Sequence, residues 1–137
     1  MIPAELLAEY KSTSYIVYDK DITIEINKHN KRLDELLREN AAVSWAFITA
    51  WNPYSKILPY EDNNIRHQQL ISKTKEYVCF EGEGRGRDPQ WKPENSLLIL
   101  GISKDDAVEI GNHFKQYAIV TGEYGNAAEL QISKLKI

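Results

Sequence analysis

The chain has 137 residues, with 17 Lys and Arg against 20 Asp and Glu, so its formal net charge is −3. This length predicts one domain with a core of its own, and the weakly acidic charge disfavours duplex DNA as a partner. The one cysteine, Cys79, cannot form an internal disulfide, and no Cys/His cluster has zinc-site spacing, so neither a metal nor another cofactor is expected.

The most apolar stretch, residues 41–51, is too short to cross a membrane. The N-terminus also lacks the basic start and apolar run of a signal peptide. We therefore expect a soluble cytoplasmic protein that does not bind membranes.

The first 43 residues predict a helix, a hairpin and a second helix. Pro3 suits a first helical position, and apolar residues three and four apart continue the helix to Tyr10. Two β-branched or aromatic runs, residues 15–18 and 22–26, flank a polar turn and predict the hairpin. Asn30 can cap the second helix, whose leucines form one apolar stripe.

From Ser44 the predicted order is β-α-β-β-α-β. The run 45–51 reads as a central strand, and Ser103 with Asp106 forms a capping box for the second helix of this part. The remaining elements are a helix over 61–75, strands over 77–81 and 96–102 joined by a Gly/Arg-rich loop at 82–94, a strand over 117–121 and an edge strand over 129–132.

This order predicts an α/β (α+β) fold of split-βαβ type, a ferredoxin-like two-layer sandwich with a mostly antiparallel sheet. Residues 44–137 would form its core, and residues 1–43 would be an extension packed on that core within a single domain.

Right-handed crossovers bring four chain segments to one pole of such a sheet: the end of the first core strand, the start of the first core helix, the 82–94 loop and the end of the second core helix. Their side chains suit an anion, because amides can orient a ligand, guanidinium groups can hold phosphate or carboxylate, and an indole can stack. The candidate ligand-binding residues are Asn52, Asn63, Asn64, Arg66, Arg85, Arg87, Trp91 and Gln116.

Each candidate also has an ordinary structural explanation. Asn52 with Pro53 is a common turn, and the glycines of the loop match neither a Walker loop nor a dinucleotide fingerprint. A concave pocket that holds Asn64, Arg66 and Gln116 would favour a ligand. Amides tied to backbone groups would instead favour a protein interface.

Few residues suit catalysis. Glu81 or Glu83 can serve as a general base, with His67 or His113 as the proton partner. Hydrolysis or transfer at phosphorus is the chemistry these groups would allow, but no nucleophile motif accompanies them, so whether the protein is an enzyme stays open.

Five short segments, residues 13–15, 47–53, 63–66, 91–96 and 113–119, resemble a bacterial family, the domain of unknown function 3293 (DUF3293). The resemblance places Asn52, Asn63, Asn64, Arg66 and Gln116 inside family motifs, and it implies no activity for them. The chain departs from the family at Lys115, where a small residue, often glycine, is expected.

We therefore expect a small domain that binds a compact anionic or nucleotide-like ligand at this pole. The alternative is a non-catalytic protein-interaction module that uses the 82–94 loop and exposed aromatics, including Tyr54, Tyr60 and Trp91. Single-stranded nucleic acid on the open sheet face would need exposed aromatics and a basic groove there.

Overall fold

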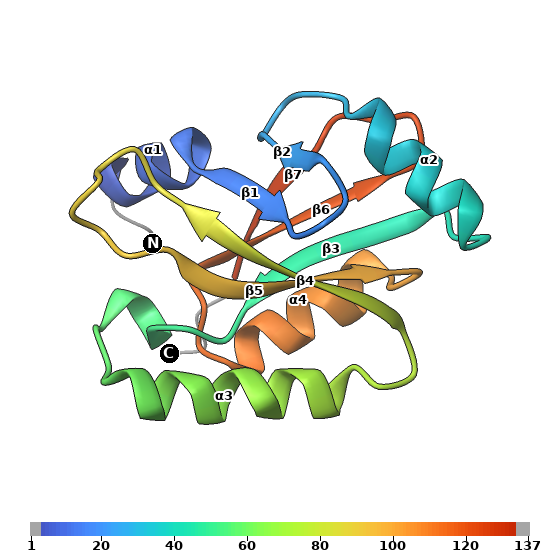
Figure 1. The fold of residues 1–137 in the computed structure, drawn as a ribbon. Helices are drawn as coiled ribbons and strands as arrows, with labels where there is room; N and C mark the ends of the chain where they lie inside the picture. Colours follow the sequence, from blue (N-terminus) through green and yellow to red (C-terminus); the bar gives the residue numbers. More distant parts are fainter. Residues whose placement is uncertain (1–3, 134–137) are drawn as a thin grey trace.

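The computed structural model describes residues 4–133. Within this range the chain forms four α-helices and a seven-stranded antiparallel sheet with the strand order β2-β1-β4-β5-β3-β6-β7 (Figure 1). The elements are α1 (Ala4–Ser12), β1 (Ser14–Val17), β2 (Ile22–Ile24), α2 (Lys31–Glu39), β3 (Ser44–Thr49), a short 3-10 helix η1 (Pro53–Ser55), α3 (Tyr60–Lys73), β4 (Val78–Arg85), β5 (Glu94–Leu100), α4 (Lys104–His113), β6 (Ala118–Glu123) and β7 (Glu129–Ile132).

The N-terminal elements follow the sequence prediction. Helix α1 ends at Ser12, and Pro3, its expected first residue, lies outside the described residues. Strands β1 and β2 pair as an antiparallel hairpin, and the Asn30 side chain accepts a hydrogen bond from the Leu33 N–H at 2.9 Å, which caps α2. Strand β1 also pairs with β4, so the hairpin extends the sheet.

The predicted bounds of β4 and of the loop after it are wrong. Residues 82–85 belong to the strand, so the loop spans residues 86–93 and not 82–94. Gly82 and Gly84 suggest a turn by their type, but both pair with β1 on one side and β5 on the other. A Cβ at Gly82 would lie 2.2 Å from the Ile16 carbonyl oxygen, so this strand uses a glycine for close backbone approach.

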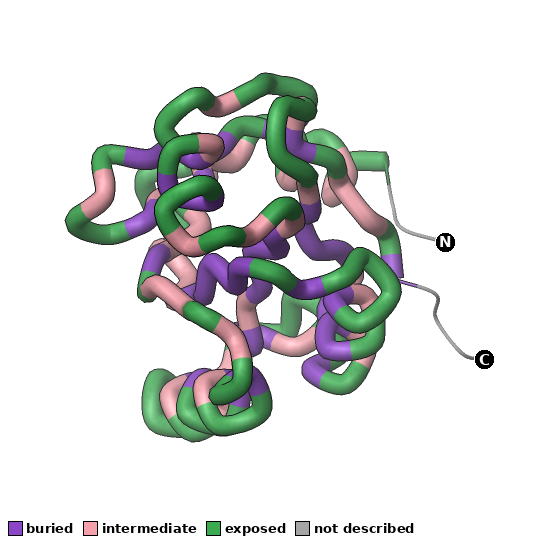
Figure 2. The backbone as a smooth tube through the Cα atoms, turned by 90° about the vertical axis from the view of Figure 1, so that its right-hand side faces the viewer, coloured by how far each residue is buried: buried purple, intermediate pink, exposed green. Residues whose placement is uncertain are grey.

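The sheet is covered on both faces. Helices α3 and α4 pack on one face, and α1 and α2 lie on the other (Figure 1). Each face has its own apolar cluster, and the two clusters divide the residues of β3, since Trp45 and Phe47 face α2 while Ala46 and Ile48 face α4. Figure 2 shows the buried residues concentrated in the middle of the molecule. The mixed α/β class and the antiparallel sheet are therefore confirmed.

The sheet curls until its two edges meet at one end. Ile26, just after β2, forms a β-bridge with Ala128, just before β7, and the Asn27 N–H donates to the Ala128 carbonyl at 2.8 Å. The result is a half-barrel whose concave face is closed at that end. Leucines of α2 and Trp45 fill the closed end, which leaves the opposite end, beneath α1, as the open mouth.

Candidate functional site

Two asparagines join the end of β3 to the start of α3. Asn52 and Asn63 are 8% and 1% exposed. The Asn52 N–H donates to Asn63 Oδ1 at 2.8 Å, and Asn63 Nδ2 donates back to Asn52 Oδ1 at 2.7 Å. Asn52 Oδ1 also accepts from the Leu58 N–H at 3.0 Å. Asn52 adopts a left-handed conformation with φ 47°, which asparagine tolerates better than most residues.

Arg66 and Gln116 tie the segment after β3 to the segment after α4. Arg66 Nε donates to the Ala50 carbonyl at 2.7 Å, and a second guanidinium nitrogen donates to the Phe114 carbonyl. Gln116 Nε2 donates to the Trp51 carbonyl at 3.1 Å. We call Asn52, Asn63, Arg66 and Gln116 the amide clamp. The structure thus brings these distant segments together, as predicted. The hydrogen bonds that Arg66 and Gln116 donate go to backbone carbonyls of the protein itself. Burial also lowers the pKa of the Arg66 guanidinium.

The other candidates at this pole lie apart from the clamp. Asn64 is half-buried on α3, one position beyond Asn63. Arg85 is exposed at the end of β4, where its guanidinium lies 2.9 Å from the Glu83 carboxylate.

The catalytic candidates lie on the sheet face that α3 covers. His67 Nε2 is 2.7 Å from Glu81 Oε1, but His67 is only 3% exposed, and its Nδ1 is buried with no hydrogen-bond partner within residues 4–133. Glu83 accepts a hydrogen bond from the Tyr18 hydroxyl at 2.8 Å. Burial and this bond raise the pKa of Tyr18 to about 12. The structure thus brings the predicted pair together, with His67 buried and the Glu81 side chain 53% exposed.

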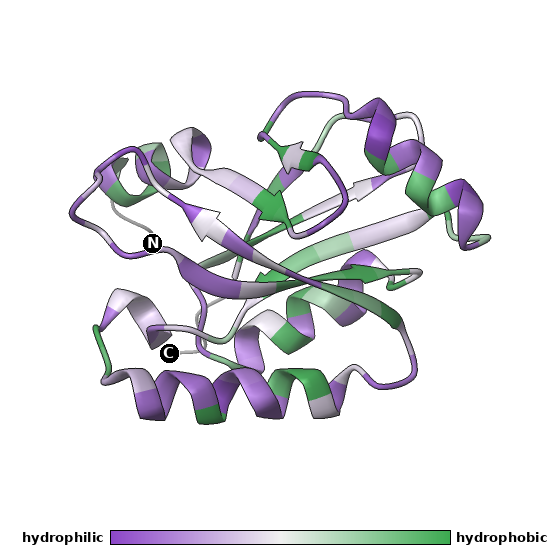
Figure 3. Cartoon of the chain, in the orientation of Figure 1, coloured by the Kyte–Doolittle hydropathy of each residue, from purple (hydrophilic) through white to green (hydrophobic). Residues whose placement is uncertain are grey.

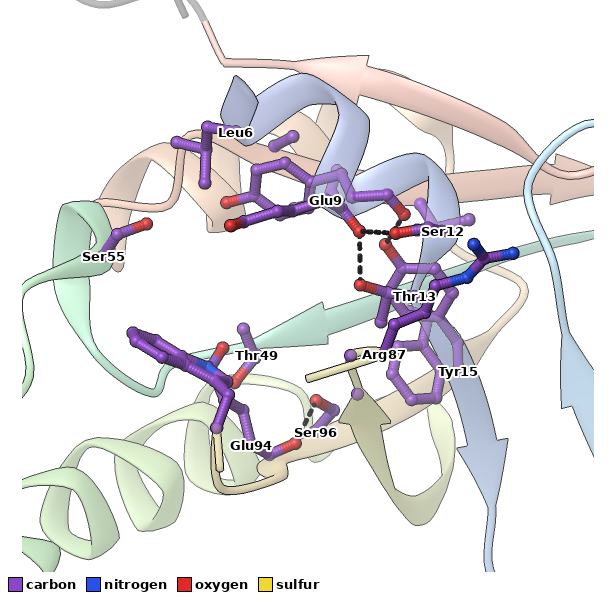
Figure 4. Close-up of a pocket in the computed structure, with 18 of the residues that line it drawn as sticks. Leu6, Glu9, Ser12, Thr13, Tyr15, Thr49, Ser55, Arg87, Glu94 and Ser96 are labelled. Atoms are coloured by element: carbon purple, nitrogen blue, oxygen red, sulfur yellow. Dashed lines mark hydrogen bonds between the residues drawn. The ribbon is translucent and has the colours of Figure 1, made fainter. Parts of the chain in front are cut away.

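A cavity of about 320 Å³ lies at the open mouth of the half-barrel. Its walls are α1, the concave face of five strands and the 86–93 loop, as the close-up in Figure 4 shows. The loop itself is largely hydrophilic (Figure 3). The lining includes Glu9, Tyr10, Ser12, Thr13, Tyr15, Thr49, Gly84, Arg87, Asp88, Trp91, Glu94, Ser96 and Val120.

The cavity exists because the concave face carries small side chains at this end. Gly84 lies opposite Tyr15 and Glu94 in the ladder, and Ser96 lies opposite Thr49. A Cβ added at Gly84 would meet its nearest atom, in Thr13, only at 3.8 Å, so there is space above this strand. At the closed end, Trp45 and the leucines of α2 pack together on the concave face.

Glu94 connects the amide clamp to the cavity. This first residue of β5 lines the cavity, and its Oε2 accepts a hydrogen bond from Asn52 Nδ2 at 3.0 Å. Burial raises the pKa of the Glu94 carboxyl, although its hydrogen bonds from Asn52 and Trp91 work in the opposite direction. Within residues 4–133, no lysine, arginine or histidine forms an ion pair with Glu94.

Several hydroxyl groups that line the cavity donate their protons to backbone carbonyls. Tyr15 donates to Tyr10 at 2.7 Å, and Thr49 donates to Asn95 at 2.6 Å. Ser96 donates to the Glu94 carbonyl at 3.0 Å. These donors are therefore already used, and burial raises the pKa of the Tyr15 hydroxyl further from neutrality.

Of the residues predicted to bind a ligand, Arg87 and Trp91 line the cavity. Sequence reasoning missed Glu94, Thr49, Tyr10 and Tyr15. Two signals were present, since Glu94 lies in the 91–96 segment and Tyr15 in the 13–15 segment that carried the family resemblance. The sequence pattern pointed to the arginines of the loop, whereas the cavity lies where the curled sheet and α1 meet.

Residues 4–133 contain neither a metal-binding cluster nor a membrane-spanning helix. No three His, Cys, Asp or Glu side chains in that range are grouped so that they could hold a metal ion. None of the helices in that range is long and apolar enough to cross a membrane.

The fold and cavity define a small α/β protein with a curled antiparallel sheet and one open mouth. A family model described as "Protein of unknown function (DUF3293)" matches residues 48–119, more than half of the chain, so the protein belongs to this family. The match spans all four residues of the clamp and the 86–93 loop but does not include α1. No curated protein and no solved structure matches the chain significantly.

Proposed function

We propose that this protein binds a compact organic molecule in the cavity at the mouth of the half-barrel. The observation that carries the proposal is the cavity itself, whose volume of about 320 Å³ lies at the lower end of the range of small-molecule sites, about 300–1,000 Å³. Its walls combine aromatic and apolar side chains with a few polar groups, which is the usual composition of such sites.

The amide clamp supports the proposal indirectly. Asn52 is held by Asn63 and the Leu58 N–H, and it holds Glu94 in turn. A binding carboxylate works best when neighbouring groups fix its position. We therefore assign Asn52 and Asn63 a positioning role instead of the direct ligand contact that the sequence predicted. Arg66 and Gln116, which donate to the carbonyls of Ala50 and Trp51, would hold the backbone just before Asn52 in place.

The predicted anionic ligand fits this cavity poorly. Three of the lining residues, Glu9, Asp88 and Glu94, carry carboxyl groups, against one guanidinium, that of Arg87. Chemistry at phosphorus through Glu81, Glu83 and His67 stays a prediction that the cavity does not favour. Glu81 and Glu83 alternate along β4 with Gly84, which lines the cavity, so they point to the opposite face of the sheet.

Occluding the cavity tests the proposal. Small phenyl compounds would be screened by ligand-observed NMR against the wild type, Gly84→Val and the control Thr23→Val, which places the same side chain at an exposed position of β2. Binding to the wild type and the control, with loss of at least tenfold in affinity for Gly84→Val, is the expected result. Trp91→Ala, at a 42% exposed position, removes one wall and should weaken binding even if Gly84→Val folds badly. Equal binding to all variants would overturn the proposal.

A protein-interaction surface is the second candidate. Tyr54, Tyr60 and Trp91 are 39%, 66% and 42% exposed, and aromatic residues are enriched in interfaces. Arg66 and Gln116 of the clamp donate hydrogen bonds to backbone carbonyls, which also favours this candidate. A partner that binds Gly84→Val normally but loses affinity for Tyr60→Ala would support it.

We also propose that residues 44–137 form a split-βαβ core of ferredoxin-like type with residues 1–43 as its extension. The supporting observation is the strand order β4-β5-β3-β6, with both crossover helices on one face of the sheet. A cytoplasmic location stays a prediction from the sequence.

A further inference from the structure

The polar groups on the inner wall of the cavity are mainly acceptors. The hydroxyls of Thr13, Tyr15, Thr49 and Ser96 each donate to a backbone carbonyl, so their protons are not free for a ligand. The Glu94 carboxylate, which can only accept, remains on the inner wall together with the Tyr10 hydroxyl, which can donate or accept. A ligand group that reaches Glu94 must therefore supply the hydrogen-bond donor itself.

The charge on Glu94 is incompletely compensated. It accepts from neutral side chains, Asn52 and Trp91, and no cation within residues 4–133 pairs with it. A carboxylate withdrawn from water is costly unless it is paired, and burial raises the pKa of Glu94 accordingly. A ligand cation placed beside it would remove that cost.

Among the described residues 4–133, the one cation of the lining, Arg87, lies elsewhere. Figure 4 shows the Arg87 guanidinium near Ser12 at the end of α1, away from Glu94, which lies with Thr49 on the other side. Arg87 is also exposed, whereas Glu94 is half-buried. The Glu94 carboxylate is therefore the charged group of the inner part of the cavity, and aromatic residues, Tyr10, Tyr15 and Trp91, line the same cavity.

From these contacts we infer that the cavity recognises a protonated nitrogen carried on a compact apolar or aromatic body, with Glu94 as its counter-ion. This inference rests on the proposed function and adds the chemical class of the ligand, an organic cation. Aromatic side chains favour the same class, because a cation near the face of a tyrosine or tryptophan ring is stabilised.

Three phenyl compounds of similar size separate the classes: 2-phenylethylamine, which is a cation, 2-phenylethanol, which is neutral, and 3-phenylpropanoate, which is an anion. Ligand-observed NMR at neutral pH should give the amine at least tenfold tighter binding than either analogue. Glu94→Gln keeps the shape and should remove that preference. Glu123→Gln, the same change of charge at an exposed position of β6 outside the cavity lining, should keep it.

The outcomes distinguish the inference from the proposed function. If the alcohol or the anion binds as tightly as the amine, and Gly84→Val abolishes that binding, the proposed site stands and the cation inference is wrong. The inference is also wrong if Glu94→Gln binds the amine as the wild type does. If none of the three compounds binds, or if Gly84→Val binds all three normally, both the inference and the site lose their support.

Discussion

Neighbouring asparagines on α3 have very different surroundings. Asn63 is 1% exposed and exchanges hydrogen bonds with Asn52, whereas Asn64 is half-buried and lies outside that exchange. Removing one partner from a buried hydrogen-bonded pair leaves the other unsatisfied, which costs about 1–3 kcal/mol. The two residues therefore form a matched pair for measuring the amide clamp.

Asn63→Ala should lower the free energy of unfolding by about 2 kcal/mol, as measured by urea denaturation. Asn64→Ala should change it by less than about 0.5 kcal/mol, because the substitution removes no buried hydrogen bond and alanine favours the helix. Equal effects of the two substitutions would show that the clamp does not stabilise the fold.

Glu94 should make stability fall as the pH rises. Its folded-state pKa is raised above the ordinary value of 4.5, so the folded protein binds this proton more tightly than the unfolded chain does. The unfolding free energy therefore declines between pH 4.5 and the raised pKa, and the full cost remains above both values.

Glu94→Gln removes this titration while keeping an acceptor for Asn52. Denaturation over a pH series should show the variant gaining stability relative to the wild type as the pH rises above 4.5. A constant difference between the two proteins across that range would contradict the burial of the carboxyl group.

Two strand glycines on the concave face differ in the space around them. A Cβ at Gly122 would lie 2.5 Å from the Trp45 ring, whereas at Gly84 the nearest atom is 3.8 Å away. Gly122→Ala should therefore destabilise the protein by about 1–3 kcal/mol through overpacking. Gly84→Ala should be neutral or stabilising by up to about 1 kcal/mol, since alanine loses less backbone freedom in a strand. Thermal and urea denaturation of both variants would check this contrast, and a reversed order would refute the cavity at Gly84.

Helix α4 ends through a strained lysine. Lys115 has φ 57°, a left-handed conformation that favours glycine, and its carbonyl accepts from the Tyr54 N–H at 2.7 Å. This geometry explains why the family resemblance leads one to expect a small residue there. Lys115→Gly should raise the unfolding free energy by about 0.5–1 kcal/mol, and Lys115→Ala should not, because alanine carries the same Cβ. A gain for alanine equal to that for glycine would show that the conformation carries no strain.

Local patterns were sufficient to predict most elements of the chain. Asn30 and Ser103 cap α2 and α4 as expected, because a cap depends on residues three positions apart. The extent of β4 could not be predicted from local sequence, since Gly82 and Gly84 are held in the strand by pairing with β1, more than 60 residues earlier in the chain. Long-range pairing overrode the turn preference of glycine.

At the scale of the whole molecule, the sheet curl determines where the cavity lies. The bridge between Ile26 and Ala128 joins the two edges at one end, and the apolar cluster under α2 fills that end. The other end stays open between α1 and the 86–93 loop. No short segment encodes this arrangement, so the sequence indicated two residues of the cavity lining, Arg87 and Trp91, but not the cavity or Glu94.

The central claim, that the cavity is the binding site, is tested most directly by mapping backbone amide chemical shifts of ¹⁵N-labelled protein during titration with the tightest-binding phenyl probe. If the probe occupies the cavity, the amides of four residues on the concave face should shift together with one saturation curve: Thr49, Gly84, Ser96 and Val120. Amides of Lys73 and Asn112, on the helices that cover the opposite face, should stay in place. Saturable shifts confined to those helices would contradict the claim.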